Sequence, residues 1–229
     1  MIHSVRLVLF DIDGTLVGDD PAALRAWNAV APKISGLPSD QISTFDYRGH
    51  TDRAIVSMLA DIGHRLETEA EATAWLRLKD EAMLEIIEHD PGAKCPKTLP
   101  GVPELLARLM DSRAVLGVAS GITRVAANSK MDRAGLPKDA FSVWSLGDHV
   151  TRTDWLVQDA IDLVSASPGE TLVVGNTPSY IEAAHACGAR ALAVATGPYS
   201  FSDLRRAGAD YVAHSLDISD PAAIAVFGQ

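Results

Sequence analysis

Six short apolar runs alternate with helix-like segments, and this alternation constrains the fold of the chain more than any other feature. The first run, Arg6–Ile12, stops at the turn-forming Asp13-Gly14-Thr15, which predicts a buried strand. The other runs are Ala114–Ala119, Val143–Leu146, Thr171–Val174, Ala189–Ala195 and Asp210–Ala213. Apolar residues recur at helical spacing over Val102–Met110, Thr123–Ala134, Trp155–Val164 and Ser179–Cys187. The pattern predicts an α/β fold, a Rossmann-like parallel sheet with helices on both faces.

The residues between the first run and Pro100 have a different composition. They contain no strand-like run, and helical spacing covers Pro21–Ile34, Thr51–Ile62 and Leu66–Glu88. We therefore predict a core domain of residues 1–17 and 96–229, with a helical cap, residues 18–95, inserted into it.

Charge and composition exclude several classes of protein. Among 229 residues the net charge is −10, and no run of lysine and arginine occurs, which argues against a nucleic-acid partner. No apolar stretch approaches the length of a membrane span. The two cysteines, Cys95 and Cys187, lack metal-ligand spacing, which is typical of a reduced, cytoplasmic protein. The sequence leaves open whether the protein is a monomer or a homodimer.

Polar residues follow three of the predicted strands at the edge where open α/β sheets bind ligands. Asp11, Ser120 and Asn176 would all lie there. Asp11 and Asp13 are two residues apart where the first strand opens into a loop. Phosphoryl transfer can use such a pair asymmetrically, with one acid as nucleophile and the other as general acid and then base. The alternative is an ordinary Asp-Gly turn.

The hexapeptide Asp11-Ile12-Asp13-Gly14-Thr15-Leu16 resembles the first motif of the haloacid dehalogenase superfamily, in its phosphatase-like branch with a helical cap. The resemblance implies that Asp11 is the nucleophile and a ligand of Mg²⁺. It also implies that Asp13 transfers protons and offers its backbone carbonyl to the metal. Dehalogenases proper work without metal and do not need the second acid, so Asp13 favours phosphoryl chemistry.

Two further motifs of the superfamily have counterparts here. Ser120-Gly121 resembles the second motif, which implies that the Ser120 hydroxyl binds the transferring phosphoryl group and that Gly121 contacts the substrate. A strand-terminal Ser-Gly also occurs as a plain turn. The third motif is a cation that offsets negative charge at the site. Arg152 is our first candidate and Lys130, on the helix after Ser120, the second; either can also be a surface cation.

The fourth motif departs from the pattern of the superfamily. Where the family carries two acids, this chain has Asn176 and Tyr180, in Gly175-Asn176-Thr177-Pro178-Ser179-Tyr180. Asn keeps an acceptor oxygen without the charge of Asp, and Tyr cannot replace a carboxylate that orients a metal ligand. Asp11, the Asp13 carbonyl and Asn176 could still hold Mg²⁺ with water and phosphate, at lower affinity. Asp148 is an alternative source of the missing carboxylate.

In the predicted cap, the segment from Tyr47 to Arg53 resembles the Gly-x-Thr-Asp segment that faces the active site in helical-capped relatives. The resemblance makes Arg48, His50, Thr51 and Arg53 candidate substrate contacts, because a phosphorylated ligand needs cations. Thr51 also suits a plain helix N-cap.

The leading expectation is a Mg²⁺-assisted phosphatase that acts on a small phosphorylated metabolite. A second hypothesis is a catalytically impaired relative that binds such a metabolite or a protein partner, because both acids of the fourth motif are missing. Haloacid dehalogenase and phosphomutase activities are further, weaker alternatives.

Overall fold

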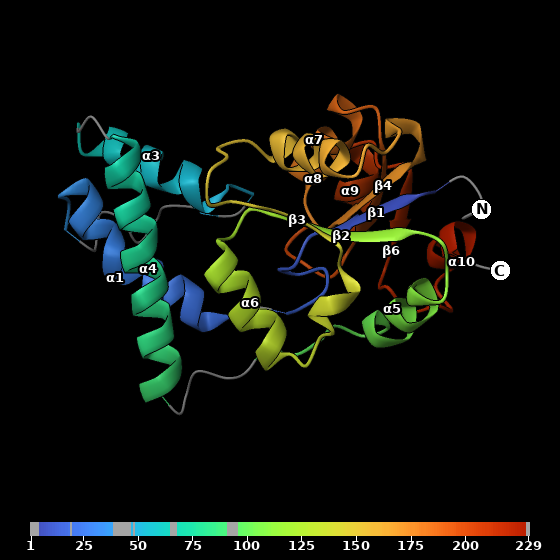
Figure 1. The fold of residues 1–229 in the computed structure, drawn as a ribbon, viewed down its shortest axis with the longest axis horizontal. Coiled ribbons are helices and arrows are strands. Elements are labelled where there is room, and N and C mark those ends of the chain that lie inside the picture. Colours follow the sequence, from blue (N-terminus) through green and yellow to red (C-terminus); the bar gives the residue numbers. More distant parts are fainter. Residues whose placement is uncertain are drawn as a thin grey trace.

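The described residues form an α/β body and a group of three helices (Figure 1). The structure is a computed structural model, and it describes residues 5–18, 20–38, 47, 49–64, 68–90 and 96–227. Arg48 and Cys95, both named in the predictions above, lie outside the described residues, as does the start of the predicted helix Leu66–Glu88.

All six predicted runs form strands of one parallel sheet, in the order β3-β2-β1-β4-β5-β6. The strands are β1 (Leu7–Phe10), β2 (Val115–Ser120), β3 (Val143–Leu146), β4 (Thr171–Gly175), β5 (Arg190–Val194) and β6 (Tyr211–Ala213). Every residue of β1 and β4 is buried, because helices cover both faces of the sheet. The predicted fold class is confirmed.

Two apolar clusters separate the helices by face of the sheet. One cluster lies against α5 (Val102–Met110), α6 (Arg124–Arg133) and α10 (Pro221–Phe227); the other lies against α7 (Thr153–Leu163), α8 (Pro178–Ala186) and α9 (Phe201–Arg206). Figure 1 shows α7 and α8 on one side of the sheet and α5 on the other. The helices α9 and α10, of six and seven residues, were not predicted.

The helices α1 (Pro21–Ser35), α3 (Asp52–Ile62) and α4 (Glu69–His89) pack on one another around an apolar cluster of their own. Each begins at a side-chain cap. Asp20, Thr51 and Thr68 accept hydrogen bonds from backbone N–H groups in the first turns of α1, α3 and α4. These helices stand beside the sheet at the end where α6 begins (Figure 1).

The chain leaves the α/β body and returns to it through two segments that lie side by side. Gly18 N–H donates to the Lys97 carbonyl at 2.9 Å, and Leu99 N–H donates to the Leu16 carbonyl at 3.0 Å. This pairing lies next to the expected boundaries of the cap at 17/18 and 95/96, which stay a prediction. Among the described residues, no helix is both long and apolar enough to cross a bilayer.

Candidate active site

Asp11 and Ser120 meet at the carboxyl edge of the sheet. Strands β1 and β2 pair with Phe10 opposite Val118, so Asp11 follows β1 next to the end of β2. The Ser120 hydroxyl donates to Asp11 Oδ1 at 2.8 Å, and the backbone N–H of Ile12 donates to the same oxygen at 2.7 Å. Asp11 is 6% exposed and Ser120 is 1% exposed. The predicted nucleophile and phosphoryl-binding hydroxyl are therefore in direct contact.

The environment of Asp11 disfavours its charge. Burial raises the pKa of the Asp11 carboxyl from 3.8 to about 7, and the negative charge of Asp13 adds to this shift. Hydrogen bonds from Ser120, Tyr180 and Ile12 lower the pKa and offset part of the burial effect. A positively charged group near Asp11 would therefore favour its ionised form, which is the nucleophile.

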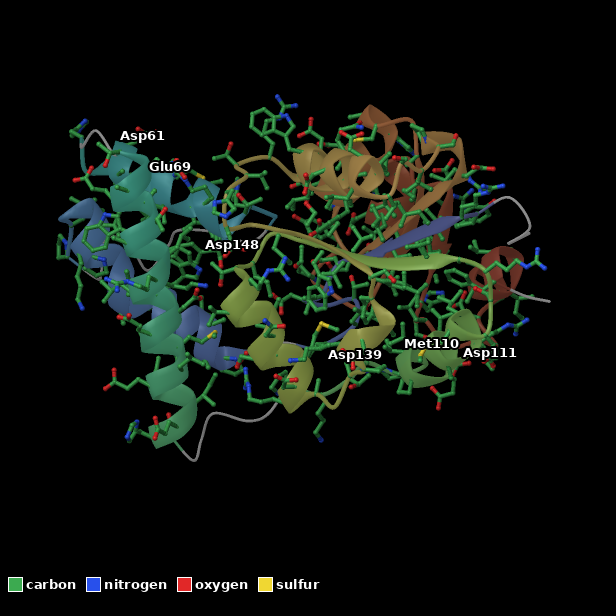
Figure 2. The ribbon with its side chains drawn as sticks, viewed as in Figure 1. Asp61, Glu69, Met110, Asp111, Asp139 and Asp148 are labelled. Carbon is green, nitrogen blue, oxygen red and sulfur yellow. The ribbon has the colours of Figure 1, made fainter. Side chains whose placement is uncertain are left out.

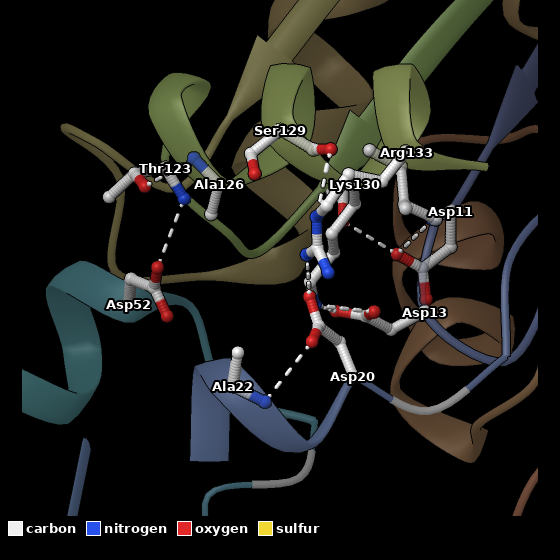
Figure 3. Close-up of polar contacts among 12 residues, drawn as sticks. Asp11, Asp13, Asp20, Ala22, Asp52, Thr123, Ala126, Ser129, Lys130 and Arg133 are labelled. Carbon is white, nitrogen blue, oxygen red and sulfur yellow. Dashed lines mark hydrogen bonds and ion pairs between the residues drawn. The ribbon is translucent and has the colours of Figure 1, made fainter. Parts of the chain in front are cut away.

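Lys130 is the cation that the fold brings to the acid pair. Its ammonium group contacts both oxygens of Asp13 at 2.6 Å, and Lys130 is only 2% exposed (Figure 3). It lies on α6, the helix that follows Ser120 and packs on the sheet beside β1 and β2. The side chain of Asp13 is 38% exposed, so this pair stands at the opening of the site, whereas Asp11 lies beneath.

Arg152, the first candidate from the sequence, is not brought to the acid pair. It precedes α7, its guanidinium pairs with Asp154, and it lies over the ring of Trp155 at 5.6 Å. Its side chain is 62% exposed. The geometry favours Lys130 over Arg152 as the cation of the site.

Asn176 follows β4 and is held between two glycines. A Cβ atom on Gly14 would lie 2.0 Å from Asn176 Nδ2, and one on Gly197 would lie 2.3 Å from it. Gly14 also has a φ of +69°, which side chains rarely adopt. Thr196, beside Gly197, donates its hydroxyl to the Gly14 carbonyl and ties the two loops together. The roles of Thr196 and Gly197 were missed, because a turn after a strand explains them equally well in the sequence.

Tyr180, on α8, lies near Asp11, and its hydroxyl lowers the pKa of the Asp11 carboxyl group. It is 6% exposed, and its ring packs on Gly175, where a Cβ atom would lie 2.7 Å from the Tyr180 ring. Burial and the adjacent Asp11 raise the pKa of the Tyr180 hydroxyl well above 10, so it stays a neutral donor. The sequence indicates the loss of an acid here; the structure places a hydroxyl group that favours the ionised form of the nucleophile.

A fit for Mg²⁺ can be tested on the polar atoms at this edge. Among the described residues, no three His, Cys, Asp or Glu side chains cluster as a metal site. Asn176 Oδ1, however, is a buried oxygen with no hydrogen-bond partner in the described part of the chain. Asn176 follows β4, the strand next to β1, which ends before Asp11. Mg²⁺ is commonly held by one or two carboxylates together with waters and phosphate, so Asp11 and Asn176 fit a weak site. Asp148, the alternative source of the missing carboxylate, accepts a hydrogen bond from the Arg124 backbone N–H at 3.0 Å, at the start of α6 (Figure 2).

The residues predicted as substrate contacts in the cap make different contacts in the structure. Thr51 caps α3 and donates its hydroxyl to the Val150 carbonyl, so it joins the cap to a loop of the core. The Arg53 guanidinium contacts Glu69, the first residue of α4, at 3.1 Å; Figure 2 labels Glu69. Gly121 receives the cap segment directly, because a Cβ atom there would lie 2.9 Å from the His50 carbonyl oxygen. The cap segment therefore rests on the loop after Ser120.

His50 and Arg152 line a groove of about 280 Å³ between the segment from Gly49 to His50, the start of α7 and one side of α8. Its described lining also includes Ser179 and Glu182, and it does not include Asp11 or Asp13. The acid pair of Asp11 and Asp13, rather than this groove, therefore marks the candidate site of chemistry.

Comparison with known proteins agrees with this arrangement. Residues 8–194 match the family model of the haloacid dehalogenase-like hydrolases. A phosphoglycolate phosphatase of Synechococcus elongatus is 27% identical over 84% of this chain and 85% of its own length, and hexitol phosphatase A of Escherichia coli is 29% identical over 91% and 90%. A hydrolase of Pseudomonas syringae has the same fold, with a TM-score of 0.70 at 22% identity over 93% of this chain and 95% of that one. The chain belongs to the haloacid dehalogenase-like hydrolases, in their phosphoglycolate phosphatase-like branch.

Proposed function

We propose that the chain hydrolyses a small phosphomonoester through an aspartyl-phosphate on Asp11, with assistance from Mg²⁺. The observation that carries the proposal is the buried contact between Asp11 and Ser120, with Asp13 and Lys130 paired above it. The curated relatives with phosphatase names support phosphate esters as the substrate class.

In the first step a carboxylate oxygen of Asp11 attacks phosphorus and the ester oxygen leaves. Asp13, in its protonated form, gives its proton to that leaving oxygen, so an alcohol departs. In the second step Asp13 takes a proton from water, the water oxygen attacks phosphorus, and the Asp11 carboxylate is released with inorganic phosphate. One acid thus serves as nucleophile and the other as acid and then base.

Ser120 and Lys130 act on the phosphoryl group in this scheme. The Ser120 hydroxyl donates to Asp11 in the structure, and it is placed to donate to a phosphoryl oxygen bound over that carboxyl group. Lys130, which forms an ion pair with Asp13 in the structure, supplies the positive charge that the transferring group requires. Its burial strengthens this effect, since charges interact more strongly away from water.

The proposed metal would be held by Asp11 and by the unpartnered Asn176 Oδ1, with the Asp13 carbonyl that the family resemblance implies. Bound there, Mg²⁺ supplies positive charge that offsets the carboxylate and the phosphate. Because Asn176 is neutral and Tyr180 carries no charge, we expect weaker metal binding than an acidic fourth motif would provide.

A specific observation favours a second candidate, a catalytically impaired relative that binds a phosphorylated metabolite. Asn176, after β4, and Tyr180, on α8, stand where the family has acids, and the Tyr180 hydroxyl acts on the Asp11 carboxyl itself by lowering its pKa. The intact pair of Asp11 and Asp13 supports the catalytic alternative. Three further expectations stay predictions: the protein binds neither nucleic acid nor a membrane, it is cytoplasmic, and it is a monomer or a homodimer.

The test is phosphate release from sugar, glycolate-like and aromatic phosphomonoesters, with Mg²⁺ and with a chelator. We expect turnover that the chelator abolishes and that Asp11→Asn lowers by about 10³-fold or more, because the nucleophile is lost. Circular dichroism of the variant checks that it folds. Turnover that is the same in Asp11→Asn would contradict the assignment, and binding of inorganic phosphate without any turnover would favour the second candidate.

A further inference from the structure

Four buried polar residues join the cap helices to α6, and the proposed chemistry does not use them. They are Asp52 on α3, Lys79 and Asp80 on α4, and Thr123, the N-cap of α6; together we call them the α6 clamp. Their exposed fractions are 4%, 1%, 6% and 0%, respectively. Charged groups so deep in a protein need complete pairing.

The pairing within the α6 clamp is complete at Lys79 and at the Thr123 hydroxyl. The Lys79 ammonium contacts Asp52 Oδ2 at 2.7 Å, Asp80 Oδ1 at 2.6 Å and Thr123 Oγ1 at 3.2 Å, which uses its three donors. The Thr123 hydroxyl donates to Asp80 at 2.7 Å and accepts from Lys79 and from the Ala126 N–H. The Thr123 backbone N–H donates to Asp52 at 3.0 Å.

The other end of α6 is also held by the start of the cap. The Arg133 guanidinium pairs with Asp20, whose side chain is buried and caps α1 through the Ala22 N–H (Figure 3). Between the two ends, Ala126 packs with Ala22, Ala26 and Met83 of the cap helices. Contacts from the cap therefore run along α6.

Lys130 lies between these two attachments. Thr123, Ala126, Lys130 and Arg133 follow one another at spacings of three, four and three residues, so they share one face of α6. Figure 3 shows Thr123, Lys130 and Arg133 with their partners Asp52, Asp13 and Asp20 along this helix. The two attachments of the cap to α6, at Thr123 and at Arg133, therefore lie on either side of Lys130.

We propose that the α6 clamp is a positioning device that sets Lys130 against Asp13 and the phosphoryl group when the cap is seated on α6. The proposal rests on the proposed function. Its residues act through Lys130 and do not touch the substrate.

The chemistry of the α6 clamp supports this role over simple adhesion of the cap. A buried cation with two acids contributes little net stability compared with apolar residues of similar size. Directional hydrogen bonds instead fix one orientation, since every donor and acceptor has a single place. The described part of α6 buries few large apolar side chains, mainly Met131, so packing alone does little to fix its rotation and sliding.

The experiment combines Thr123→Val, which removes the hydroxyl at nearly constant shape, with Lys130→Met in a double-mutant cycle on kcat/KM. Thr123→Ser keeps the hydroxyl and tests rescue. Thr68→Val is the matched control, because Thr68 also caps a helix, α4, and donates its hydroxyl to an acid, Glu71, without reaching α6. Hydrogen exchange over residues 124–133 reports the position of α6 independently of turnover.

We expect Thr123→Val to lower kcat/KM by about 10-fold or more, since small misplacements of a catalytic group have effects of this size. Thr123→Ser should stay within about 3-fold of wild type and Thr68→Val within about 2-fold. In the Lys130→Met background, Thr123→Val should change kcat/KM by less than about 2-fold, because the positioned group is already gone.

The same loss from Thr123→Val in both backgrounds would overturn the proposal, as would unchanged exchange of α6 in Thr123→Val. The two proposals fail in different ways. A wild-type protein without phosphate release refutes the proposed function; the exchange measurement then still decides whether the α6 clamp holds α6 in place.

Discussion

The two helices that border the acid pair bring opposite chemistry to it. On the α6 side the contacts are ionic, with Lys130 on Asp13 and Arg133 on Asp20. On the α8 side they are neutral, with Asn176 beside Gly14 and the Tyr180 hydroxyl on Asp11. The difference teaches that this chain keeps a cation suited to a phosphoryl group on the α6 side, whereas the α8 side lacks the two carboxylates of the family's fourth motif.

Among changes to the two helices, replacement of the α6 cation should have the largest effect on turnover. We expect Lys130→Met to lower kcat/KM by about 10²- to 10³-fold, because it removes the positive charge facing the transferring group. The matched variant Arg152→Met should stay within about 3-fold of wild type, since an exposed ion pair contributes little. Steady-state phosphate release measures both. A larger loss in Arg152→Met than in Lys130→Met would break the comparison.

Asp11, which lies between α6 and α8, should lower the free energy of unfolding at neutral pH when no metal is bound. The pKa of Asp11 is about 7 in the folded state against an ordinary value of 3.8, so ionisation is harder when folded. Stability from this group is therefore greatest below about pH 4 and falls as the pH rises to about 7. Asp11→Asn lacks this loss and should be more stable than wild type by about 2–4 kcal/mol above pH 7.

Urea unfolding in chelator at pH 4.5 and pH 8 measures this difference. The advantage of Asp11→Asn should be larger at pH 8 than at pH 4.5. Excess Mg²⁺ serves as the control, because it should stabilise wild type more than the variant. An advantage that does not change with pH would show that burial does not shift the Asp11 pKa.

The neutral α8 side should give the smallest effect on the chemistry. Tyr180→Phe removes a donor that lowers the pKa of Asp11, so that pKa should rise further. The acid limb of the pH profile of kcat/KM should then move to higher pH, with a loss of about 3- to 10-fold at pH 7 that shrinks as the pH rises. A profile that keeps its position would exclude Tyr180 as a donor to the nucleophile.

The sheet and the first two motifs could be predicted from the sequence. The first two apolar runs are short and end at Asp13-Gly14 and at Ser120-Gly121, so strand ends and site residues coincide in the sequence. Parallel strands then bring Asp11 and Ser120 to one edge without further information. The short helices α9 and α10 escaped prediction because one or two turns carry too little periodicity.

The contacts made by side chains could not be predicted in the same way. Lys130 was ranked below Arg152 because the sequence does not reveal which turn of α6 lies over the edge of the sheet. Tyr180 was counted only as a missing acid, since its contact with Asp11 depends on how α8 packs against Gly175. Lys79 and Thr123 give no signal in the sequence. Apart from the adjacent Asp80, the acids and the hydroxyl that pair across the α6 clamp lie 27 to 71 positions apart in sequence.

The most direct test of the account is the Mg²⁺ dependence of phosphate release in wild type and in Asn176→Asp. The account predicts turnover in wild type that rises with Mg²⁺, and a concentration for half-maximal rate that falls by about 10- to 100-fold in Asn176→Asp, since that variant restores a carboxylate to the neutral side. The same Mg²⁺ dependence in both proteins would contradict a metal site at Asn176. Turnover in Asn176→Asp alone would contradict phosphatase activity in the natural chain.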